Sequence, residues 1–91
     1  MPEKRPEPSF EFVQLLTSHQ SRLYAYVLSL LGNRSQAEDV VQETNAVLWR
    51  KAHDFKPGTN FGAWMLKVAY FQVMDHGHLG LTLANLNSNH E

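Results

Sequence analysis

Three polar residues in the middle of the chain have the spacing of a binding face. Asp39, Gln42 and Glu43 lie at positions i, i+3 and i+4, so a helix would carry them on one side. Carboxylates there can form charge-assisted hydrogen bonds with arginines of a partner. Two carboxylates could also support acid–base catalysis, but no nucleophile accompanies them. The sequence predicts no catalytic residue and leaves a protein-binding face or a solvated polar face.

The segment at residues 55–60 (FKPGTN) contains the groups that a site for an unstacked nucleobase needs. A cation, exposed backbone at a glycine and two short polar side chains can hold a base edge beside an aromatic wall. The candidates for base contact are Lys56, Gly58, Thr59 and Asn60. The alternative is an ordinary turn between two helices, with Phe55 and Phe61 filling the core.

Aromatic residues continue into the next segment, where Trp64, Tyr70 and Phe71 follow. Such rings can stack on unpaired bases. Trp64 also falls on a helical stripe with Val68, so at least part of its side chain is expected in the core. Trp49 has two interpretations as well, because it either seals the edge of the core or contacts a partner.

Histidines give no convincing metal site. His76 and His78 with His90 could supply ligands, but no carboxylate or thiolate completes the set. The sequence therefore predicts neither a metal nor a cofactor.

Composition limits the remaining possibilities. The chain has 91 residues, no cysteine, 43% hydrophobic residues and a formal net charge of −1. These values predict one small folded domain without disulfides or a thiolate zinc site. No apolar run is long enough for a membrane span, the N-terminus does not resemble a signal peptide, and a cytoplasmic location is expected. The near-zero charge argues against binding nucleic acid by bulk electrostatics alone.

Apolar residues recur at helical spacing and predict three helices. The predicted bounds are about 9–31, 35–53 and 61–75. Ser9 and Gly32 are expected to cap the first helix, a capping box from Ser35 opens the second, and Asn60 or Thr59 caps the third.

The predicted fold class is all-α, a three-helix bundle over residues 9–76. Residues 1–8 hold three of the four prolines and are expected to form a flexible leader. Residues 77–91 contain glycines, asparagines and alternating leucines, which predict a flexible tail or a lone strand rather than helix. The expected contacts between the second and third helices are Val40, Val41, Val47, Leu48, Trp64 and Val68.

Several motifs occur together in a characteristic order. They are Leu23-Tyr24, AEDVVQET at 37–44, Trp49, FKPG at 55–58, FGAW at 61–64 and Val68-Ala69. This pattern resembles region 2 of bacterial RNA polymerase sigma factors, especially the extracytoplasmic-function (ECF) class of the sigma-70-like family. The resemblance covers about residues 10–75.

The resemblance implies a transcription initiation factor that binds core RNA polymerase and helps to recognise and melt the upstream promoter hexamer. One side of the second helix would bind the coiled-coil clamp of the large polymerase subunit. The clamp-binding residues would be Asp39, Gln42, Glu43, Trp49 and Arg50. An anti-sigma factor is left open as a further partner, and no membrane is implied.

The resemblance also implies contacts with promoter DNA. The loop at 55–60 would receive a base flipped out of the promoter, and the third helix would lie against the non-template strand. The DNA-binding residues on that helix would be Trp64, Lys67, Tyr70 and Phe71.

Three features depart from the family pattern. The family usually has asparagine where this chain has Phe71, and often arginine where it has Tyr70. No Lys or Arg follows Lys67, although the family has an arginine-rich helix end there, and no helix-turn-helix domain follows. Since phosphate neutralisation supplies much of DNA affinity, weak binding to free duplex is expected.

Three interpretations follow from this uneven match. The favoured one is the N-terminal domain of a longer sigma factor, truncated or frameshifted after about residue 75. The others are a short polymerase-binding protein that has lost DNA contact, and a helical interaction module unrelated to transcription.

Overall fold

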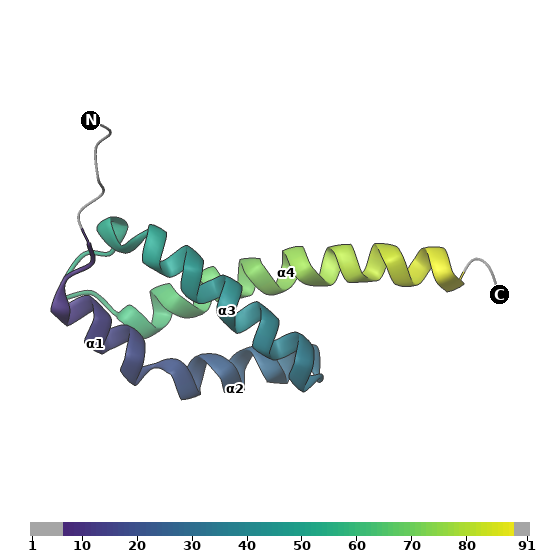
Figure 1. The fold of residues 1–91 in the computed structure, drawn as a ribbon, viewed down its shortest axis with the longest axis horizontal. Coiled ribbons are helices and arrows are strands. Elements are labelled where there is room, and N and C mark those ends of the chain that lie inside the picture. Colours follow the sequence, from purple (N-terminus) through teal and green to yellow (C-terminus); the bar gives the residue numbers. More distant parts are fainter. Residues whose placement is uncertain (1–6, 89–91) are drawn as a thin grey trace.

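The computed structural model describes residues 7–88, with side chains described for residues 7–76. In this part of the chain the regular structure is all helical and there is no strand, so the predicted all-α class is confirmed (Figure 1). The elements are α1 (Phe10–Ser18), α2 (Gln20–Leu31), α3 (Arg34–Arg50), the 3-10 turn η1 (Ala52–Asp54) and α4 (Phe61–Ser88). α2, α3 and α4 pack against one another. α1 continues into α2 and packs its buried Phe12 against Phe61 and Trp64 of α4.

The first predicted helix is two helices, because the chain breaks at His19. This residue ends α1 and begins α2 with φ −104° and ψ 6°, outside helical geometry. Side chains at the break add hydrogen bonds to backbone oxygens of the preceding turn: Ser18 Oγ donates to Leu15 O at 3.1 Å, and Gln20 Nε2 donates to Leu16 O at 3.0 Å. The His19 N–H also donates to Leu15 O at 3.1 Å and to Leu16 O at 3.3 Å. Polar side chains that hydrogen-bond locally to the backbone favour such a break.

Helix caps agree with the prediction at three of four positions. Ser9 Oγ accepts from Phe12 N at 3.0 Å, Gly32 is left-handed with φ 70°, and Asn60 Oδ1 accepts from Ala63 N at 2.9 Å. The predicted capping box at Ser35 is wrong. Asn33 caps α3 by accepting from Gln36 N at 2.9 Å, so that helix begins one residue before Ser35.

Two predicted helix ends are also wrong. α3 ends at Arg50, and the chain then forms η1 where continued helix was expected. α4 does not stop near residue 75; its backbone continues as helix to Ser88, beyond the ends of the other helices (Figure 1). The lone strand suggested for the leucine-rich segment is therefore wrong. Flexibility was expected over residues 1–8 and 77–91. Residues 1–6 and 89–91 of these ends lie outside the described residues, and the backbone of 77–88 is helix.

The core lies where α2, α3 and α4 meet. Its buried apolar residues are Phe12, Leu23, Val27, Ala37, Val40, Leu48, Phe55, Phe61, Met65, Ala69 and Val73. Val40 and Leu48 are fully buried as predicted, whereas Val41, Val47, Trp64 and Val68 are only half-buried at its edge. On α4, Phe71 is exposed and Gln72 is half-buried, so the helix turns Gln72 rather than Phe71 towards the core.

A reciprocal amide pair joins α2 to α3. Gln20 Nε2 donates to Asn45 Oδ1 at 2.9 Å, and Asn45 Nδ2 donates to Gln20 Oε1 at 2.8 Å. Both side chains are half-buried. The pair fixes how α2 lies along α3, at the position where the chain leaves the break at His19.

Thr44 is the one polar residue among the fully buried side chains of the described core. Its hydroxyl has no hydrogen-bond partner, and the residue is completely buried, so water cannot supply one. A buried hydroxyl without a partner costs free energy, because it loses its hydrogen bonds to water.

Thr44→Val should therefore stabilise the domain. Valine has nearly the same shape and removes the unpaired hydroxyl, so the free energy of unfolding should rise by roughly 1–2 kcal/mol. Urea denaturation followed by circular dichroism measures this change. Thr17→Val, at an exposed position on α1, is the matched control and should change stability little. A destabilised Thr44→Val variant would contradict the prediction.

Candidate functional site

The predicted polar face runs along the whole of α3. Asp39, Gln42, Glu43, Trp49 and Arg50 are all exposed. Their spacing of i, i+3, i+4, i+10 and i+11 places them within one side of the helix. The residues buried on the opposite side are Ala37, Val40, Thr44 and Leu48. The sequence thus correctly predicted which side of this helix is exposed.

This α3 face has the chemistry of a protein interface. Asp39 and Glu43 are one helical turn apart, so both carboxylates can reach cations of the same partner. At the other end of the helix, the Trp49 side chain is 45% exposed beside Arg50. Tryptophan and arginine are the residue types that most often anchor protein interfaces.

The loop between η1 and α4 is held by its own hydrogen bonds. Gly58 has φ 89°, and the Thr59 hydroxyl donates to Lys56 O at 2.6 Å while the Thr59 N–H donates to the same oxygen at 3.1 Å. Asn60 caps α4 through its Oδ1. Two of the predicted base-contact residues therefore also stabilise the loop, while the exposed Lys56 ammonium makes none of these hydrogen bonds.

Four aromatic rings pack together behind this loop. Phe61 lies 5.6 Å from Phe12, 5.2 Å from Phe55 and 5.7 Å from Trp64, measured between ring centroids. Phe55 and Trp64 are 5.2 Å apart. Phe55 and Phe61 are thus core residues, as the turn interpretation expected. Trp64 is half-buried in the same cluster, so most of its contacts are with protein.

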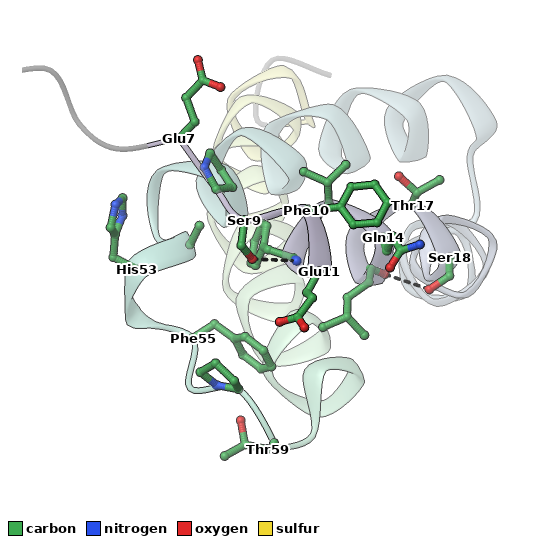
Figure 2. A pocket seen from close by; sticks show the side chains of 17 residues that line it. Glu7, Ser9, Phe10, Glu11, Gln14, Thr17, Ser18, His53, Phe55 and Thr59 are labelled. Carbon is green, nitrogen blue, oxygen red and sulfur yellow. Dashed lines mark hydrogen bonds between the residues drawn. The ribbon is translucent and has the colours of Figure 1, made fainter.

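A groove of about 1100 Å³ separates the loop from α1 (Figure 2). One wall comes from the start of α1, including Phe10 and Glu11, and the other includes Phe55, Gly58 and Thr59. The predicted loop therefore forms part of a concave site. The groove brings Gly58 and Thr59 to one site, whereas Lys56 and Asn60 do not line it.

The predicted residues of α4 lie in two different environments. Lys67, Tyr70 and Phe71 are exposed on one side, where Tyr70 and Phe71 touch edge to face with centroids 5.8 Å apart. Trp64 lies with the aromatic cluster instead. The structure therefore joins Trp64 to the loop and leaves the other three as a separate surface.

Arg22 is a cation near the loop that the sequence analysis missed. A Cβ on Gly62 would lie 2.6 Å from Arg22 Nη1 and 3.5 Å from Asn60 Oδ1, so the guanidinium occupies the space left by this glycine at the start of α4. The signal in the sequence was a glycine inside a helix, which often marks a close approach. Only the fold shows that the approaching group comes from α2.

The described residues contain no group of three histidine, cysteine or acidic side chains arranged to hold a metal ion. Within that same part of the chain, every helix is too short or too polar to cross a membrane.

The comparison with protein families matches residues 15–76 to the model of Sigma-70 region 2. The chain belongs to this family. The match includes α2, α3, the loop and the part of α4 that packs in the core. Sigma factors are transcription initiation factors, so the α3 face and the loop groove are surfaces of a sigma factor domain.

Relatives of this region 2 domain are ECF RNA polymerase sigma factors. It is 34% identical to SigE of Mycolicibacterium smegmatis over 75% of this chain, and 32% identical to BldN of Streptomyces coelicolor over 71%. EcfG of Rhodopseudomonas palustris is 39% identical over 50% of the chain. The matched segment spans about a quarter of the length of each relative (25%). No solved structure matches.

The Asn60 cap gives a test that separates a structural from a binding role. Asn60→Ala removes the acceptor for Ala63 N and should lower the free energy of unfolding by about 1 kcal/mol. Asn60→Asp keeps an acceptor and should retain stability. Thermal unfolding measures both, with Asn33→Ala as a control that removes the equivalent cap of α3. No loss of stability in Asn60→Ala would contradict the capping role.

Proposed function

We propose that this domain binds the coiled-coil clamp of the large RNA polymerase subunit through the α3 face. The observation that carries the proposal is the uninterrupted exposed side of α3, with Asp39, Gln42 and Glu43 at one end and Trp49 and Arg50 at the other. Two separated groups of contacts fix the direction of a partner helix as well as its position. The ECF sigma factor names of the relatives support polymerase as that partner and a cytoplasmic location.

We further propose that the loop and α4 recognise single-stranded promoter DNA once polymerase is bound. The groove beside Gly58 and Thr59 would receive a base flipped from the upstream hexamer, since an extruded base needs a shaped site with polar edges and apolar walls. Lys56 and Arg22 would neutralise nearby phosphates. Lys67, Tyr70 and Phe71 would contact the non-template strand, with Trp64 supporting the loop from behind.

The domain is proposed to act as part of a larger sigma factor. The relatives continue well beyond the matched segment, and a second DNA-reading domain would supply promoter affinity that this one lacks. The favoured interpretation of a truncated or frameshifted sigma factor therefore stays a proposal. An anti-sigma partner stays open in the same way.

A second candidate is a short polymerase-binding protein that does not bind DNA. Its support is the exposed side of α4, where Lys67 is the single cation among the residues with described side chains and aromatic groups replace the family's usual arginine and asparagine. The two candidates share the α3 face and differ only in DNA binding.

The first test concerns the α3 face. Asp39→Arg with Glu43→Arg should weaken binding to the isolated clamp coiled coil by at least a hundredfold, because two charge-assisted contacts become repulsive. Calorimetric titration measures the dissociation constant. The control is Asp54→Arg with Asp75→Arg, which makes the same charge change at exposed positions outside α3. Equal binding by the two double variants would refute the proposed clamp site.

The second test concerns DNA. With core polymerase present, a fluorescent non-template-strand oligonucleotide should bind about fivefold more weakly to Lys56→Ala and to Arg22→Ala, since each loses one phosphate contact. Arg34→Ala removes an exposed cation at the start of α3 and should leave binding unchanged. Anisotropy measures the affinity. If the parent chain adds no oligonucleotide affinity to polymerase, the second candidate function is favoured.

A further inference from the structure

An apolar patch covers the outward side of α4. Tyr70, Phe71 and Met74 are 44%, 55% and 50% exposed. They lie within little more than one turn of the helix, and the Tyr70 and Phe71 rings touch. Large apolar side chains that gather on one exposed side of a helix are typical of an interaction surface.

Opposite charges flank this patch at equal distances. Lys67 lies four residues before Phe71, and Asp75 lies four residues after it. All three are exposed. Because residues four apart lie one turn apart on the same side of a helix, the order along this line of α4 is cation, ring and carboxylate.

We propose that a second copy of this chain binds the patch, with the two α4 helices antiparallel and crossing at Phe71. In that arrangement Lys67 faces Asp75 of the partner subunit, and Asp75 faces Lys67 of the partner subunit. The two Phe71 rings meet on the two-fold axis, between Tyr70 and Met74 of each copy. A two-fold interface requires this reciprocity, in which residue i meets j and j meets i.

The charge pattern is what favours a second copy over an unrelated partner. A partner of different sequence would not require charges of opposite sign placed symmetrically about one aromatic residue. The patch and its two flanking charges together span only about two turns of helix, so the area that a dimer would bury is below that of a stable dimer. The expected result is a weak dimer that forms in the range of about 10–100 μM.

The dimer would compete with DNA. Lys67, Tyr70 and Phe71 belong both to the dimer surface and to the side of α4 proposed to contact the non-template strand, so one copy cannot use them for both. This consequence rests on the proposed function, whereas the dimer itself does not.

Sedimentation velocity of the full chain from about 5 to 500 μM tests the dimer. The sedimentation coefficient of the parent should rise with concentration, and Phe71→Glu should remain monomeric throughout. All substituted positions are exposed, and circular dichroism checks that each variant keeps the parent's helix content and melting temperature. A parent chain that stays monomeric over the whole range would overturn the proposal.

Charge reversal tests the antiparallel arrangement directly. Lys67→Glu alone places two acidic side chains opposite each other, and Asp75→Lys alone places two basic ones, so each variant should dimerise at least tenfold more weakly than the parent. An equimolar mixture restores both oppositely charged pairs and should form heterodimers. Unchanged self-association of either variant, or no association in the mixture, would overturn the arrangement.

A third experiment, with DNA, distinguishes the dimer proposal from the proposed DNA contact of α4. A single-stranded promoter oligonucleotide with core polymerase should bind Phe71→Glu weakly and should shift the parent towards monomer. If the dimer forms as described but the oligonucleotide leaves it unchanged, the dimer surface is supported and the proposed DNA contact of α4 fails.

Discussion

The aromatic cluster is the constraint on which the arrangement of this domain depends. Phe12 comes from α1, Phe55 from the end of η1, and Phe61 and Trp64 from the first turn of α4. Their mutual contacts at 5.2–6.3 Å join three segments that share no continuous helix. Since ring pairs at these distances favour tilted or edge-to-face packing, the cluster fixes the loop between two helix ends. The groove lies between this loop and α1.

The two sides of α3 have different roles. The buried side, which includes Val40 and Leu48, contributes to the core, and the other side carries the proposed polymerase contacts. Changes of charge on the exposed side therefore leave the packing intact. On α4 the separation is less complete, because Trp64 packs in the aromatic cluster while Phe71 is left in solvent.

Much of this architecture could be predicted from local patterns. Ser9, Gly32 and Asn60 act as caps because capping depends on a few neighbouring residues, and the exposed side of α3 follows from its apolar spacing. The break at His19 and the helical continuation of α4 could not be predicted in this way. The first lies where polar side chains hydrogen-bond to nearby backbone oxygens, and the second runs against the weak helix propensity of glycine and asparagine. Arg22 reaches the loop through a contact between distant segments.

The amide pair between Gln20 and Asn45 has a consequence for how the domain responds to its surroundings. Neither side chain carries a charge, so added salt or a change of pH does not alter the two hydrogen bonds that align α2 with α3. Contacts made by exposed carboxylates and guanidinium groups are instead screened as ionic strength rises. The ionic conditions of the cell would thus adjust how tightly this domain holds its proposed partners while its internal alignment stays the same.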